Sequence, residues 1–197
     1  MKPSMAFVFL FVVTVSAFPQ AGPFGFEKGM TRQQVIHLLG KPAKADGDQL
    51  MFDTAPKPHA GYVLYSLNFS PKEGLLKVVA GGHFIHTDDH GTELRSAYQD
   101  AINAISKKYG EPRLAVDRCN VSSEVDCADE HWMYALNEKK RELVAFWVPE
   151  ANASHVSAIE VEAVTIDYSK GALEITFEFT GWEAYSKAQM EKEDQKY

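Results

Sequence analysis

Three histidines and three carboxylates are concentrated in one short stretch, GGHFIHTDDHGTE, at residues 81–93. Imidazole nitrogens and carboxylate oxygens are common ligands of zinc and copper. His83, His86 and His90 would share one face if the stretch were helical. One hypothesis is therefore a periplasmic metal-binding protein that holds zinc or copper with these three histidines.

The residues around these histidines favour a simpler interpretation. Two glycines precede them, and Thr-Asp-Asp-His-Gly is typical of a strand end followed by a helix start. In an extended segment His83 and His86 would point to opposite faces. We therefore expect solvated histidines, with Asp88 or Asp89 favouring the start of the next helix.

Other catalytic patterns are lacking. The sequence contains no G-x-S-x-G nucleophile elbow, no H-E-x-x-H zinc motif and no P-loop. Four glutamates, Glu160, Glu162, Glu174 and Glu178, alternate with apolar residues, which is typical of the solvent-facing side of an antiparallel sheet. We expect a protein without enzymatic activity and without a cofactor. A hydrolase with an unrecognised site is a third, less favoured hypothesis.

Aromatic residues are concentrated in the second half of the chain, and such side chains dominate binding surfaces when they are exposed. Strands bury one face, so about half of these residues should belong to the core. We expect Tyr134, Trp147 and Trp182 to be the candidates for contact with a protein partner.

The N-terminal residues 1–17 have the pattern of a secretory signal peptide. Lys2 precedes an apolar run from Met5 to Val15, and Val15-Ser16-Ala17 suits signal peptidase. The apolar run is shorter than the roughly 20 residues that span a bilayer, and no cysteine near the cut could carry a lipid. We expect a periplasmic or secreted protein with no membrane anchor in the mature chain.

Composition narrows the possible partners. The 197 residues are 45% hydrophobic and 24% charged, which is normal for a globular protein and excludes extensive disorder. Twenty basic residues against 27 acidic residues give a net charge of −7, which argues against nucleic-acid binding.

The two cysteines, Cys119 and Cys127, are candidates for a disulfide within a polar loop, because an exported protein meets an oxidising environment. Their spacing also lacks the C-x-x-C pattern of redox or metal sites.

The first predicted helix has clear start and stop signals. Thr31 and Gln34 can form a capping box, while Gly40 and Pro42 can end the helix. We expect this helix to bury Val35, Leu38 and Leu39 against a sheet.

A second helix is predicted from about Thr92 to Tyr109, and it also ends in Gly-x-Pro. Aligning Gly40 with Gly110 sets an offset of 70 residues, which also places Ser66-Leu67-Asn68 near Ala135-Leu136-Asn137. We infer a first repeat at 18–90, a second repeat with an extra C-terminal hairpin at 91–184, and a charged tail at 185–197.

Alternating residues predict three hairpins. Their strands are 62–69 with 75–79, 132–136 with 143–148, and 159–168 with 172–179. The predicted fold is a two-layer α+β structure, a tandem helix-plus-hairpin repeat with the helices on one face of an antiparallel sheet.

The segment GFEKGMTRQQVIHLLGKP, followed by YVLYSLNF and GLLKVV, resembles the BamE/SmpA/OmlA domain of small outer-membrane-assembly lipoproteins. The duplication also looks like the tandem arrangement of secreted β-lactamase-inhibitor proteins. These resemblances imply an exported, non-enzymatic module that binds another envelope or secreted protein through its sheet. This chain differs by lacking the lipid-bearing cysteine and by carrying a second half.

Overall fold

The computed structural model describes residues 22–121, 124–151 and 154–194, so the predicted signal peptide lies outside the described residues. The elements, in chain order, are η1 (Pro23–Gly25), α1 (Arg32–Leu39), β1 (Lys44–Asp46), β2 (Gln49–Phe52), β3 (Tyr62–Ser70), β4 (Gly74–Gly82), β5 (Ile85–His86), α2 (Thr92–Tyr109), β6 (Leu114–Cys119), α3 (Glu124–Cys127), η2 (Asp129–His131), α4 (Trp132–Asn137), β7 (Arg141–Trp147), β8 (Val156–Asp167), β9 (Lys170–Phe179) and α5 (Trp182–Asp194).

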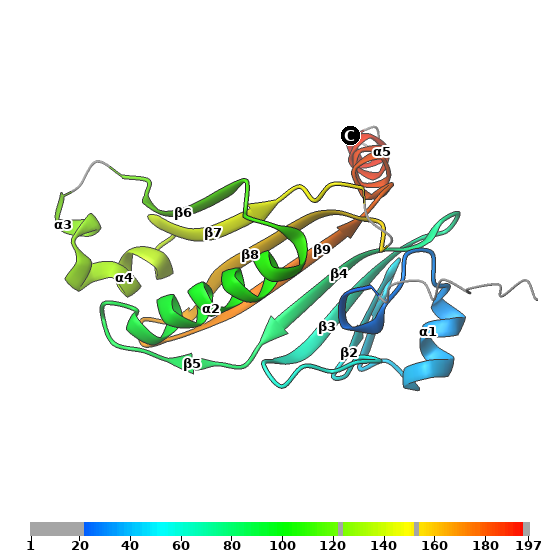
Figure 1. The fold of residues 1–197 in the computed structure, drawn as a ribbon, viewed down its shortest axis with the longest axis horizontal. Coiled ribbons are helices and arrows are strands. Elements are labelled where there is room, and N and C mark those ends of the chain that lie inside the picture. Colours follow the sequence, from blue (N-terminus) through cyan, green and yellow to red (C-terminus); the bar gives the residue numbers. More distant parts are fainter. Residues whose placement is uncertain (1–21, 122–123, 152–153, 195–197) are drawn as a thin grey trace, which may run out of the picture.

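Within the described residues, nine antiparallel strands form one sheet (Figure 1). Across the sheet the strands lie in the order β1-β2-β3-β4-β9-β8-β7-β6. The two-residue strand β5 stands outside this series and pairs with the beginning of β9, at Lys170 and Gly171. Because β4 lies beside β9, the two halves of the chain share one sheet. The predicted α+β class, with helices packed on an antiparallel sheet, is confirmed.

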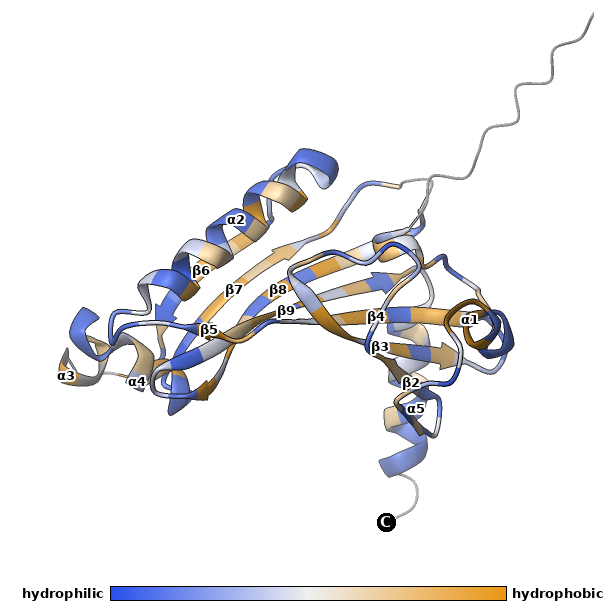
Figure 2. Cartoon of the chain, turned by 90° about the horizontal axis from the view of Figure 1, so that it is seen from below, coloured by the Kyte–Doolittle hydropathy of each residue, from blue (hydrophilic) through white to orange (hydrophobic). Residues whose placement is uncertain are grey.

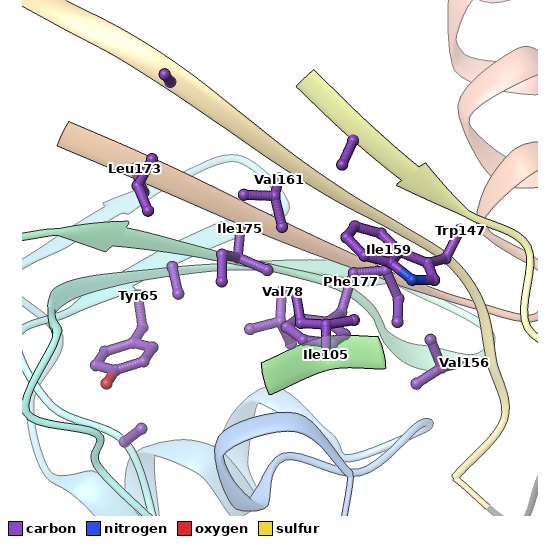
Figure 3. Packing of buried hydrophobic residues seen from close by; sticks show 14 of the residues in the cluster. Tyr65, Val78, Ile105, Trp147, Val156, Ile159, Val161, Leu173, Ile175 and Phe177 are labelled. Atoms are coloured by element: carbon purple, nitrogen blue, oxygen red, sulfur yellow. The ribbon is translucent and has the colours of Figure 1, made fainter. Parts of the chain in front are cut away.

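The core lies between α2 and one face of this sheet. Ile105 of α2 packs among Val78 of β4, Ile175 and Phe177 of β9 and Ile159 of β8 (Figure 3). The same buried cluster includes Val35 of α1. Burial of these apolar side chains is the main driving force for the fold.

Helix α1 starts and ends as its sequence predicts. Thr31 and Gln34 form the capping box, with distances of 3.2 Å from the Gln34 amide to the Thr31 hydroxyl and 2.7 Å from the Thr31 amide to the Gln34 side chain. Val35 is buried, but Leu38 is 52% exposed, so the expectation that Leu38 packs on the sheet is wrong. The buried side of this short helix is formed by Val35 together with the partly buried Ile36 and Leu39, and Leu38 lies to one side of it.

The two Gly-x-Pro helix ends are alike in structure. Gly40 and Gly110 have φ values of 84° and 82°, and each donates its N–H to the carbonyl four residues earlier. Strands β1 and β6 then begin at Lys44 and Leu114, which keeps the 70-residue offset. The structural likeness is limited to these two helix ends and the strands that follow them. A duplication of the complete first half of the chain stays a prediction.

The offset fails beyond these junctions. Residues 132–136, which the sequence analysis predicts as a strand, form helix α4. Trp132, Met133, Ala135 and Leu136 are buried, and this spacing is that of a helical face rather than of a strand. The strand opposite β7 is instead β6, which the sequence analysis does not predict.

The C-terminal hairpin is confirmed as β8 and β9. Along β9, Leu173, Ile175, Phe177 and Phe179 are buried, whereas Glu174, Thr176 and Glu178 are partly exposed. The predicted tail begins inside α5, a helix that extends from the sheet on the side opposite α2 (Figure 2). Among the described residues, no helix has the length and hydropathy needed to cross a membrane.

Candidate functional site: the open face of the sheet

The sheet face opposite α2 carries a mixed polar and apolar surface, which we call the open face. Cross-strand partners point to the same side of a sheet, so the register of the four central strands defines its members. They are Lys77, Val79 and Gly81 of β4, Glu174, Thr176 and Glu178 of β9, Ala158, Glu160 and Glu162 of β8, and Glu142, Val144 and Phe146 of β7.

Carboxylates dominate this surface. Glu162 lies directly opposite Glu174 in the β8–β9 register, and Glu178 pairs with Ala158 two rows further along. Partial burial raises the pKa of Glu162, and the charges of Glu160, Glu174 and Glu142 raise it further. Burial also raises the pKa values of Glu174 and Glu178, with Glu160 adding to both effects. The ionised form of these glutamates is therefore less stable than it would be in water, and an approaching cation would stabilise it.

Lys77 is the single basic residue among the twelve described residues of the open face. Its ammonium lies 3.7 Å from the Glu178 carboxylate and 5.1 Å from the centre of the Trp182 ring. The Lys77 charge opposes the upward shifts in the pKa values of Glu174 and Glu178. On the neighbouring strand β6, Arg118 forms an ion pair with its register partner Glu142. Two cations therefore stand against five carboxylates, which leaves a net negative surface.

Helix α5 forms a wall at one end of the open face. Trp182 packs beside Tyr185 with ring centres 5.9 Å apart. The Tyr185 hydroxyl donates a hydrogen bond of 2.6 Å to the Asp48 carboxylate, in the turn between β1 and β2. This contact joins the C-terminal helix to the first hairpin, 137 residues earlier in the chain.

The apolar residues of the open face are partly accessible. Val79, Val144 and Phe146 each keep part of their surface in contact with solvent. Thr176 and Glu160 lie between Val79 and Phe146 in the same cross-strand row. This row therefore presents two partly accessible apolar side chains on either side of a threonine and a carboxylate.

The three aromatic residues predicted to contact a partner have different positions. Trp182 borders the open face and is partly exposed. Tyr134 is 39% exposed but lies on α4, stacked on Tyr168 with ring centres 6.0 Å apart. Trp147 is 1% exposed and donates its indole N–H to the Gly110 carbonyl at 2.9 Å. The expectation that Trp147 contacts a partner is therefore wrong, because it points into the core at the end of α2.

The structure does not assemble the predicted histidine cluster into a metal site. His83 follows β4, His86 ends β5, and both side chains are exposed. His90 pairs with Asp129 at 3.0 Å, and this hydrogen bond is the main reason that the pKa of His90 is raised. Across residues 22–121, 124–151 and 154–194, no group of three or more histidine, cysteine, aspartate or glutamate side chains is placed to hold a metal ion.

Asp88 instead has the structural role expected for a helix-start residue. Its carboxylate accepts hydrogen bonds of 2.9 Å from both the backbone N–H and the hydroxyl of Thr92, the first residue of α2. These bonds hold the pKa of Asp88 below its ordinary value.

The predicted disulfide between Cys119 and Cys127 is confirmed, with Cα atoms 5.7 Å apart. Cys119 is the last residue of β6 rather than part of a loop. The bond ties β6 to α3, just before α4. The Trp132 indole donates to the Asp117 carboxylate at 2.9 Å, which fixes α4 against β6.

The alternation in the sequence identified Glu160, Glu162, Glu174 and Glu178, but Glu142, Lys77 and the contact between Asp48 and Tyr185 were not predicted. Lys77 stands in the alternating strand Gly74–Gly82, so its parity could have placed it on the solvent side. No sequence signal pairs Tyr185 with Asp48, since the contact depends on the strand order.

Comparison of the chain with protein-family models, with curated proteins and with solved structures finds no match in any of the three.

Proposed function

We propose that this protein is an exported, non-enzymatic binding module whose open face binds a basic surface of another envelope or secreted protein. The observation that carries the proposal is the set of five glutamates on a partly apolar sheet face, against which stand Lys77 and, on the adjoining strand β6, Arg118. Raised glutamate pKa values mean that a cationic partner would stabilise the charged carboxylates.

Two features support export. The pattern at residues 1–17 is that of a signal peptide. The disulfide between Cys119 and Cys127 is of the kind that persists in oxidising compartments. The sequence resemblance to the BamE/SmpA/OmlA domain and to the secreted inhibitor proteins also supports the proposal, and it suggests that the protein acts in the bacterial envelope.

The contact can be tested with a photo-crosslinking amino acid placed at Thr176, in the centre of the open face. A control protein carries the same group at Lys107, on the exposed side of α2. In envelope extract, the Thr176 position should give a discrete adduct that the Lys107 position lacks. Adducts of equal yield at both positions, or at neither, would refute the proposed surface.

Charge complementarity needs a separate test. The double substitution Glu160→Gln with Glu174→Gln should reduce adduct formation from Thr176 about tenfold at physiological salt, because it removes two of the five negative charges. The matched double variant Glu111→Gln with Glu130→Gln changes two exposed glutamates, has the same net charge and leaves the open face unchanged. Equal losses in both double variants would point to overall charge rather than to the open face.

A further inference from the structure

A pocket of about 730 Å³ lies on the opposite side of the sheet, beneath α2, and is separate from the open face. It follows α2 from Ala97 to Tyr109, a length of about 18 Å at 1.5 Å per helical residue. Its floor is the inner side of β9, with Leu173, Ile175 and Phe177 (Figure 3). The volume falls within the range of pockets that bind small molecules.

The space exists because of the residues that α2 presents to it. Ala97, Ala101 and Ala104 lie at steps of four and three residues and therefore on one side of the helix. Neighbouring positions carry the large residues Tyr98 and Ile102, which are buried in the core. The helix thus packs tightly on the sheet along one line and leaves a hollow beside it.

An aromatic wall closes the far side of the pocket. The Phe24 ring meets Tyr62 edge-on at 5.3 Å and Phe177 at 5.9 Å. Phe24 has a φ of 53°, a left-handed conformation that is costly for a bulky residue. The Lys57 amide donates to the Phe24 carbonyl at 2.9 Å and helps to hold this conformation. Strained residues held by their surroundings often occur at ligand sites.

Among the side chains that line this pocket, hydrogen-bond donors outnumber acceptors. Lys108, His59 and His83 line the pocket, and Asp100 is the one carboxylate among its described lining residues. The Gly61 amide donates to Nδ1 of His59 at 3.0 Å, so Nε2 carries the proton of the neutral ring and is a donor. Burial raises the pKa of Tyr62 to about 12, which keeps its hydroxyl protonated and able to donate.

The geometry points to a binding site for an elongated, apolar small molecule with a carboxylate head group, such as a medium-chain fatty acid. The chain would lie along Ala97, Ala101 and Ala104 over β9. The head group would lie at the end of the pocket nearest Lys108, whose ammonium supplies the positive charge. The length of the pocket, its apolar floor and the excess of donors all fit this class of ligand.

Calorimetric titration of the purified protein with dodecanoate, below its micelle concentration, tests the site. We expect saturable one-to-one binding with a dissociation constant of about 10 µM, in keeping with the usual affinity per atom of small ligands. Dodecanol, which has the same chain without the carboxylate, should bind about tenfold more weakly. Absence of saturable dodecanoate binding would overturn the proposal.

Two variants separate the chain from the head group. Lys108→Gln should weaken dodecanoate about tenfold and leave dodecanol unchanged, whereas Lys107→Gln, one residue away, should change neither. Ala101→Phe fills the hollow and should abolish binding of both probes, with folding checked by its melting temperature. If Ala101→Phe does not fold, Ala104→Leu at the exposed edge serves the same purpose. Full binding by the filled variant, or equal effects at Lys107 and Lys108, would refute the assignment.

Discussion

Neutralising Glu162 should make the folded protein more stable at neutral pH. Glu162 lies opposite Glu174 in the sheet register, and its pKa is raised above the ordinary value of 4.5 by burial and by three neighbouring carboxylates. Like charges directly opposite each other in a sheet cost roughly 0.2–1 kcal/mol. The substitution Glu162→Gln keeps the shape of the side chain and removes the charge, so it should recover about 0.5 kcal/mol.

The stabilisation by Glu162→Gln should depend on pH. Because the pKa of Glu162 is raised, the folded state binds more protons than the unfolded state between the ordinary and the raised pKa. Stability therefore falls as the pH rises through this interval, and the cost is complete above it. The difference between wild type and Glu162→Gln should be full at pH 7 and should vanish near pH 3, where the carboxyl group is protonated in both states.

The assay is thermal unfolding at both pH values. For a chain of this size, about 0.5 kcal/mol corresponds to a rise in Tm of about 1–2 °C at pH 7. High salt should reduce the rise, because the open face is accessible to ions. Glu111→Gln, at an exposed position outside the sheet, is the control and should give no comparable rise. A gain of the same size at pH 3, or a loss at pH 7, would show that charge repulsion is not the cause.

Three further outcomes follow from the geometry. Replacing both cysteines by serine should lower the free energy of unfolding by about 2.5 kcal/mol in a urea titration, since the closed loop spans eight residues of sequence separation; a loss below about 0.5 kcal/mol would contradict this. Gly91→Ala should cost about 3 kcal/mol, because an added Cβ would lie 2.2 Å from an aromatic ring of α4 and the φ is +68°. Gly110→Ala, with φ +82° and nothing within 4 Å of an added Cβ, should cost about 1 kcal/mol, and equal losses in urea denaturation would refute the packing argument. Asp129→Asn should lower the pKa of His90 toward its ordinary value in an NMR titration, and an unchanged pKa would show that their hydrogen bond does not form in solution.

Local signals predicted much of the fold. The capping box at Thr31 and Gln34, the left-handed glycines Gly40 and Gly110, and the alternation along β9 all have their predicted structures. Each of these signals is complete within one turn of helix or a few residues of strand. No distant contact is needed to specify them.

Residues 132–136 show where local reasoning failed. The stretch WMYAL reads as a short apolar run, which suits a strand or a buried helix equally well. The hydrogen bond from Trp132 to Asp117 and the nearby disulfide favour the helix. Both are contacts with β6, a strand that the sequence analysis did not predict.

The sequence predicted most of the glutamates that lie on the open face, but it did not predict which aromatic residues lie beside them. Alternation placed Glu160 and Glu174 on the solvent side, because strand periodicity is a property of the sequence itself. Whether Trp147 or Trp182 stays exposed depends on what packs above each one. Trp147 meets the end of α2, whereas Trp182 lies on a helix beside the open face.

The sequence alone determined the ends of the first helix, two of the three predicted hairpins, the disulfide pair and the acidic character of one sheet face, because these depend on neighbours along the chain. Only the tertiary structure decided that β4 pairs with β9, that α5 borders the glutamates around Lys77, and that α2 leaves a pocket beside its alanines. Those features depend on strand order and on packing between distant segments. Such long-range contacts are fixed by the burial of the whole core and not by any local pattern.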